Sequence, residues 1–115
     1  MTKPIKGTSL AAMFFSAAKP KTETFNLLGV GQVDIVELTE GEVSEVRKSI
    51  DSEKDVAIRG KLFGYGLVVK STKKDGEPIF TAQDIPLFSG AANAAVESLA
   101  AAVLKINGYG AELGN

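Results

Sequence analysis

The side chains in this chain that could do acid–base chemistry are its carboxylates, because the sequence contains no histidine and no cysteine. The usual general base near neutral pH and the usual thiol nucleophile are therefore missing. The carboxylates that remain as candidates are Asp34, Glu37, Asp51, Glu53, Asp55, Asp75 and Asp84. Their contexts are typical of solvated side chains or helix caps rather than of a paired acid and base. We predict no catalytic residues and no enzymatic activity.

The spacing of the acidic and glycine residues predicts neither a metal site nor a cofactor site. No cluster of Asp and Glu has the alternate spacing and distal Glu of a calcium-binding loop. Gly29 and Gly31 lack the third Gly, or the following Lys-Ser/Thr, of a phosphate-binding loop. The formal net charge is −1 and the two signs are mixed along the chain. We therefore expect neither nucleic acid nor an anionic membrane as a partner.

What remains is the capacity to bind another polypeptide through apolar side chains. One apolar stretch runs from Leu10 to Phe15, and a second forms a stripe at helical spacing in the Ala-rich run from Gly90 to Lys105 and on to Ile106. Apolar stripes of this kind also form ordinary cores, so both interpretations stay open. The candidate protein-binding residues are Met13, Phe14, Phe15, Val96, Leu99 and Val103.

The chain divides into an arm, one domain and a tail. We expect residues 1–21 to form an N-terminal arm with a short helix that begins at Thr8 or Ser9. Its apolar run of about six residues is too short for a secretory core or a membrane span. Residues 22–108 are numerous enough to form a hydrophobic core, and we expect them to form a single globular domain. Residues 109–115 are expected to form a flexible tail.

The domain begins with strand-like segments. Residues 22–28 and 32–38, joined by a glycine-containing turn, predict a β-hairpin. Such a hairpin is marginal alone, so it must pack on helices or pair with another copy. Thr39 and Glu42 then have the capping-box spacing that starts a helix, which is expected to reach Ile50. The predicted fold class is α+β, mostly α-helical, with an N-terminal β-hairpin followed by three to four helices.

Residues 56–69 are ambiguous from their pattern. Their apolar residues alternate as in strands, with one slip of phase, which permits a second hairpin. Gly60, Gly64 and Gly66 would each cost about 1 kcal/mol inside a helix. If the stretch is a helix, Gly60 and Gly64 form a notch at which another helix could pack closely.

The segment from residue 75 to residue 108 combines several features in a fixed order. A charged turn precedes a proline, a capped helix start follows, and an amphipathic helix then ends at a helix stop. The residues that carry this order are Asp75-Gly76, Pro78, Phe80-Thr81, Asp84 and Asn107-Gly108. In this order the chain resembles the tail assembly chaperones of long-tailed, siphovirus-type bacteriophages. The resemblance also implies a helix over residues 56–69.

That resemblance implies a function in the infected cell. A chaperone of this family binds the tape-measure protein and keeps it soluble until tail-tube subunits polymerise around it. The family resemblance implies a host-cytoplasmic protein that is absent from the mature virion. It also implies a tail-tube partner that is recruited through a longer, frameshifted form. Self-association into a ring or spiral is a further hypothesis, since a homo-oligomer could coat a long client.

A structural protein of the virion is the alternative. A head–tail joining or tail-completion protein would have a similar size and a similar mixture of charges. The two functions differ in one observable, because a structural protein is present in purified particles at stoichiometric copy number.

Overall fold

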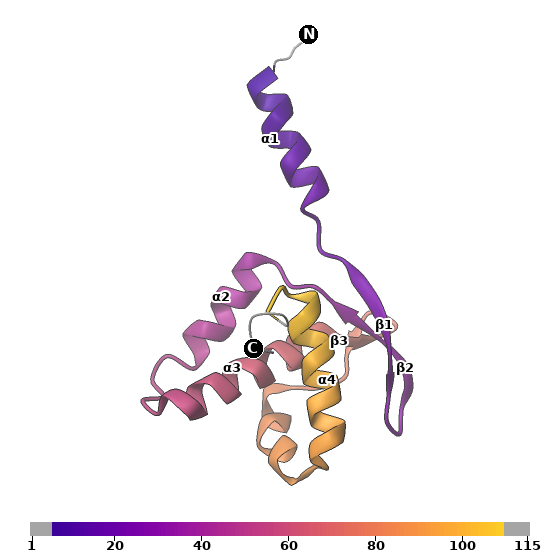
Figure 1. Cartoon of the computed structure of the whole chain (residues 1–115), viewed down its shortest axis with the longest axis vertical. Coiled ribbons are helices and arrows are strands. Elements are labelled where there is room, and N and C mark those ends of the chain that lie inside the picture. The colour runs from indigo at the N-terminus through magenta and orange to yellow at the C-terminus, as the bar shows by residue number, and fades with distance from the viewer. Residues whose placement is uncertain (1–5, 110–115) are drawn as a thin grey trace.

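The computed structural model describes residues 6–109 and measures 59 × 36 × 28 Å along its principal axes. Its first element is helix α1 (Lys6–Ala17), which projects from one end of a compact body (Figure 1). The side chains from Ser9 to Ala17 are exposed. The helix ends before Lys19-Pro20, because the residue before a proline is driven out of the helical region. The start at Lys6 precedes the predicted caps, Thr8 and Ser9.

The body contains a four-stranded antiparallel sheet in the order β1-β2-β3-β4. Its strands are β1 (Thr22–Leu27), β2 (Gly31–Val36), β3 (Thr72–Lys74) and β4 (Glu77–Pro78). In the register, Phe25 lies opposite Val33, and Ile35 lies opposite Thr72. The turn between β3 and β4 places Asp75 at φ 53° and Gly76 at φ 82°. Two successive residues with positive φ make the hairpin turn for which Asp-Gly is preferred.

The fold is α+β, but the predicted order of elements is wrong. The structure begins with helix α1, so the β1–β2 hairpin is not the N-terminal element. The hairpin is also not alone, because β3 and β4 extend it on the β2 side. This second hairpin supplies the pairing that an isolated two-stranded hairpin lacks. The sequence had predicted the Asp75-Gly76 turn but not the two short strands that flank it.

Helices α2 (Glu40–Ser49) and α3 (Val56–Ser71) follow one another and pack together. The predicted capping box starts α2: Thr39 Oγ1 accepts from the Glu42 N–H at 3.2 Å, and Glu42 Oε1 accepts from the Thr39 N–H at 2.9 Å. Asp55 caps α3 by accepting from the Ile58 N–H at 3.1 Å. The stretch whose alternation permitted a hairpin is therefore a helix. A side chain at Gly66 would collide with Val46 of α2, so a glycine is needed at this crossing.

The last two helices are η1, a 3₁₀ helix (Ala82–Gly90), and α4 (Asn93–Ile106). Helix α4 buries its apolar stripe against the sheet and α3 (Figure 1). The core thus combines β2, α2, α3 and α4 around ten buried apolar residues, which are Val33, Ile35, Leu38, Val43, Val46, Leu67, Val68, Leu99, Val103 and Ile106. Gly108, at φ 88°, ends α4 as the Asn107-Gly108 pair predicts.

Candidate protein-binding groove

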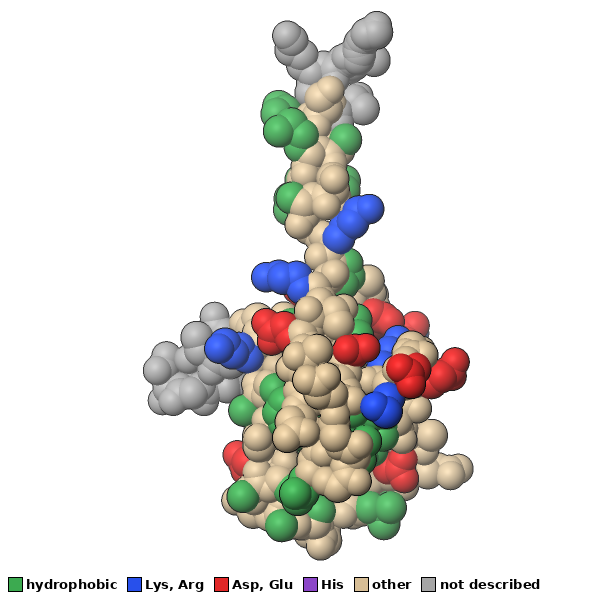
Figure 2. All heavy atoms as spheres, turned by 90° about the vertical axis from the view of Figure 1, so that its right-hand side faces the viewer, with side chains coloured by type: hydrophobic (Ala, Val, Ile, Leu, Met, Phe, Trp, Pro, Cys, Tyr) green, Lys and Arg blue, Asp and Glu red, His purple; other side chains and the backbone are tan. Residues whose placement is uncertain are grey.

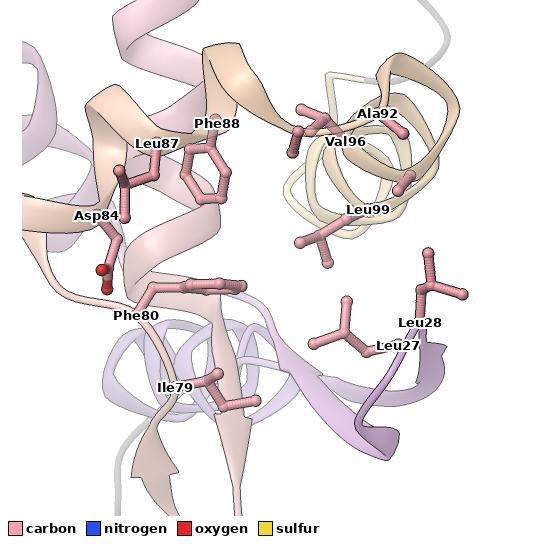
Figure 3. Close-up of a pocket in the computed structure, with 12 residues that line it drawn as sticks. Leu27, Leu28, Ile79, Phe80, Asp84, Leu87, Phe88, Ala92, Val96 and Leu99 are labelled. Atoms are coloured by element: carbon pink, nitrogen blue, oxygen red, sulfur yellow. The ribbon is translucent and has the colours of Figure 1, made fainter.

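An apolar groove of about 540 Å³ lies at the end of the body opposite α1. Its walls come from three segments that are far apart in the sequence: the tip of the β1–β2 hairpin, the segment from Ile79 through η1, and the first turns of α4 (Figure 3). The lining residues are Leu27, Leu28, Ile79, Phe80, Asp84, Leu87, Phe88, Ala91, Ala92, Ala95, Val96 and Leu99. Eleven of these twelve residues are apolar, so the groove is suited to apolar side chains rather than to a polar ligand.

Aromatic side chains hold the η1 wall of the groove in place. The Phe88 ring lies between Phe80, with ring centroids 5.3 Å apart, and Tyr65 of α3, with ring centroids 5.0 Å apart. Tilted and edge-on aromatic pairs at these distances are favourable beyond their burial alone. Phe88 therefore connects η1 to α3, which fixes one side of the groove against the core.

Asp84 is the one charged residue among the residues of the described range, 6–109, that line the groove. Its Oδ2 accepts a hydrogen bond from the Thr81 N–H at 2.8 Å, at the start of η1. This is the predicted contact between a helix cap and the residue three positions later. The carboxylate thus already has a partner at the groove edge, and it orders the segment that carries Phe88.

Two leucines form an exposed rim on opposite walls. Leu28, in the hairpin turn, is 79% exposed, and Leu87 of η1 is 68% exposed. Leu99, in contrast, is 4% exposed and belongs to the core beneath. The groove therefore has a buried base and an uncovered apolar rim, an arrangement that favours a further apolar partner.

Helix α1 presents the second exposed apolar surface. Leu10, Met13, Phe14 and Phe15 are each between 63% and 69% exposed. The Phe14 and Phe15 rings contact each other edge to face, with centroids 5.1 Å apart. Figure 2 shows hydrophobic side chains both on this projecting helix and at the far end of the body.

The six candidate binding residues separate into three groups in the structure. Met13, Phe14 and Phe15 lie together on α1, away from the groove. Val96 and Leu99 line the groove. Val103 does not belong to a binding surface: its side chain is fully buried (0% exposed), because the α4 stripe turns inward along its C-terminal half.

Sequence reasoning missed most of the groove walls. Ile79, Phe80, Leu87 and Phe88 come as two apolar pairs, each directly after a proline. A proline followed by two large apolar residues in an irregular segment was a usable signal, since such residues need a surface to cover. Gly60 and Gly64 form no packed notch within the described residues, because a side chain at either position would meet open space.

The remaining predicted groups are placed as follows. Tyr109, the first residue of the predicted tail, packs on Phe63 with ring centroids 5.6 Å apart, and its hydroxyl accepts from Arg47 Nη2 at 3.0 Å. Residues 1–5 of the predicted arm and 110–115 of the predicted tail lie outside the described residues. Within residues 6–109, no group of three or more acidic side chains is arranged to hold a metal ion. In the same range, no helix has both the length and the apolar character needed to cross a membrane.

Comparison of the chain with protein-family models, with curated proteins and with solved structures finds no match in any of the three.

Proposed function

We propose that this protein is a phage tail assembly chaperone that binds an apolar helical segment of the tape-measure protein in the groove between η1, α4 and the hairpin tip. The single observation that carries the proposal is the open apolar groove with an uncovered rim at Leu28 and Leu87. A helix laid into an apolar groove is a common way for a protein to hold a peptide. The segment from residue 75 to residue 108 resembles tail assembly chaperones. Because that family binds the tape-measure protein, we propose the tape-measure protein as the client.

The same segment that carries the resemblance also builds two of the three groove walls. It contains Ile79, Phe80, η1 and the first turns of α4. A holder of unassembled polypeptides needs exposed apolar surface on a stable body, and the groove lies on a body with a continuous core. The protein would act in the host cytoplasm, by binding alone and without catalysis, and would be absent from the mature virion. A longer frameshifted form would add the contact to tail-tube subunits.

The proposal is tested by producing the tape-measure protein together with this chain and measuring how much of the client stays soluble and co-purifies. The wild-type chain is expected to keep the client soluble. Leu87→Glu places a carboxylate on the groove rim, and desolvating that charge against an apolar client is expected to weaken binding roughly ten-fold or more. Val56→Glu is the matched control, since Val56 is 71% exposed and lies outside the groove.

Equal client solubility with and without the chain would contradict the proposal. Recovery of the chain from purified particles at stoichiometric copy number would instead support the alternative function, a head–tail joining or tail-completion protein.

A further inference from the structure

We propose that helix α1 of one copy occupies the groove of a second copy, so that the free protein associates head to tail. The arm defined by α1 and the groove are both apolar and both exposed. They lie at opposite ends of the molecule (Figure 1). The inference concerns the chain alone and does not depend on the identity of any client.

The arm presents a helical face without a partner among residues 6–109 of its own chain. Leu10, Met13 and Phe14 follow the i, i+3, i+4 spacing that places them on one side of α1. In the described part of the chain, none of the buried or partly buried residues of the core comes from α1. Residues 9–18 also carry no charged side chain. The arm is therefore an uncharged apolar helix held out in solvent, which is costly unless something covers it.

In the structure the arm points away from the groove of its own chain (Figure 1). Lys21 is already paired beside β2, because its carbonyl accepts from the Glu37 N–H at 2.7 Å and its N–H donates to Glu37 Oε1 at 3.1 Å. From Lys21, an extended linker reaches the end of α1 after roughly 14 Å, and Phe14 after about 4 Å more. Strand β1 separates Lys21 from Leu27 by roughly 20 Å. A fully reversed linker would bring Phe14 to within about 2 Å of the level of Leu27, so the arm could reach its own groove only if the linker turned back completely from the direction in which α1 projects (Figure 1).

The groove suits the arm in chemistry and in size. Among the described residues that line the groove, the one charged side chain, Asp84, already accepts from the Thr81 N–H, so an uncharged helix would leave no lining charge without a partner. A volume of about 540 Å³ accommodates a few large side chains. Leu28, on the hairpin turn, and Leu87, on η1, lie at opposite sides of the groove (Figure 3).

The contact is small, so association should be weak and depend on concentration. The three apolar side chains on one face of the arm, Leu10, Met13 and Phe14, would each lose roughly 100–150 Å² of surface, an estimate scaled down from the area that an aromatic side chain buries. With a matching area from the groove, the total is roughly 600–900 Å², which is below the size of stable specific interfaces and within the range of weak, transient ones.

The placement of the two surfaces also fixes the kind of assembly. A projecting arm at one end and a socket at the other make a heterologous contact, which gives open chains or closed rings rather than a two-fold dimer. A client helix that binds in the groove would compete with the arm of the neighbouring copy.

The test uses complementary variants of the full chain and measures mass by light scattering over a range of high concentrations. Wild type is expected to form species larger than a dimer. Phe14→Glu disables the arm, and Leu28→Glu disables the groove, so each variant alone is expected to stay monomeric. Mixed together, they are expected to form a heterodimer and nothing larger. The arm of Leu28→Glu is intact and can enter the intact groove of Phe14→Glu. No third copy can then be added, because the remaining arm and the remaining groove both carry a substitution.

Matched controls separate docking from folding. Ser16→Glu lies on the same helix as Phe14, and Val56→Glu lies on the body outside the groove; both are expected to associate as wild type does. Leu87→Glu, on the opposite wall, is expected to behave as Leu28→Glu does. Circular dichroism checks that every variant is folded. A monomeric wild type, a two-fold dimer, or a mixture of the two variants that stays monomeric would overturn the inference.

Discussion

Asn107 connects three elements of the body through one side-chain amide. Its Oδ1 accepts from the Leu38 N–H at 2.8 Å, just after β2. Its Nδ2 donates to Ser71 Oγ at 3.3 Å, at the end of α3, and to the Val103 carbonyl at 2.9 Å. These groups lie at the edge of the core, where an unpaired donor would be costly.

Replacement of Asn107 by Ala is expected to lower the free energy of unfolding by about 1–3 kcal/mol, because the Leu38 N–H loses its acceptor. Urea unfolding at equilibrium measures the change. Asn93→Ala is the control, since Asn93 is exposed at the start of α4 and should change stability by less than about 0.5 kcal/mol. Equal stability of the two variants would show that water replaces the Asn107 amide without cost.

Sequence reasoning at this scale identified the position but not its partners. The Asn107-Gly108 pair was predicted as a helix stop, and Gly108 does adopt positive φ. The hydrogen bonds from Asn107 to Ser71 and Leu38 span 36 and 69 residues of chain. Contacts over such distances depend on the packing of whole elements, so a local pattern cannot reveal them.

At the scale of elements, the three glycines of α3 have different roles. Gly66 lies against Val46 of α2, where the β-carbon of any other residue would be 2.6 Å from Val46 Cγ1. Val46 is itself buried and β-branched, so it has little freedom to move aside. A β-carbon at Gly60 or Gly64 would instead meet open space. Only Gly66 is required for the approach of the two helices.

Gly66→Ala is expected to destabilise the protein by about 1 kcal/mol or more, because overpacking outweighs the better helix propensity of alanine. Gly64→Ala is expected to stabilise it by about 0.5–1 kcal/mol through propensity alone. Thermal or urea unfolding of the two variants gives the comparison. A stabilising Gly66→Ala would mean that α2 and α3 separate easily.

The elements also show why the pattern of α3 was ambiguous. Alternating apolar residues and three glycines favour strands by local propensity, but tertiary packing overrides that preference. Leu67 and Val68 are both buried, on neighbouring positions of the helix, because α3 crosses the centre of the body. By contrast, the capping box at Thr39 and Glu42 depends on residues three positions apart, and it was predictable.

For the whole molecule, the arm and the body are expected to be energetically separate. Deletion of residues 1–17 should leave the free energy of unfolding within about 1 kcal/mol of wild type, since α1 contributes no residue to the core of the described chain. The measurement is urea unfolding at a concentration low enough to keep both proteins monomeric. Leu67→Ala serves as the positive control, with an expected loss of about 2–5 kcal/mol. Loss of cooperative unfolding after the deletion would contradict this separation.

The groove could not be predicted at this scale for a topological reason. Its walls come from Leu27 and Leu28, from the segment around η1, and from α4, which are brought together only when the sheet and α4 are assembled. The α4 stripe was predictable, yet its division into a groove half with Val96 and a core half with Val103 was not. That division depends on which part of the helix the sheet covers.

The two edges of the sheet differ in their capacity to accept another strand. Strand β4 has two residues, and one of them is Pro78, whose nitrogen carries no hydrogen to donate. Strand β1, at the other edge, has six residues with Thr22, Glu23 and Thr24 exposed. Pairing with a strand of another chain is therefore disfavoured at β4 by its proline, and it is disfavoured at β1 by the charge of Glu23. Loss of that single charge would leave the exposed edge of β1 without this protection against pairing with a strand of another chain.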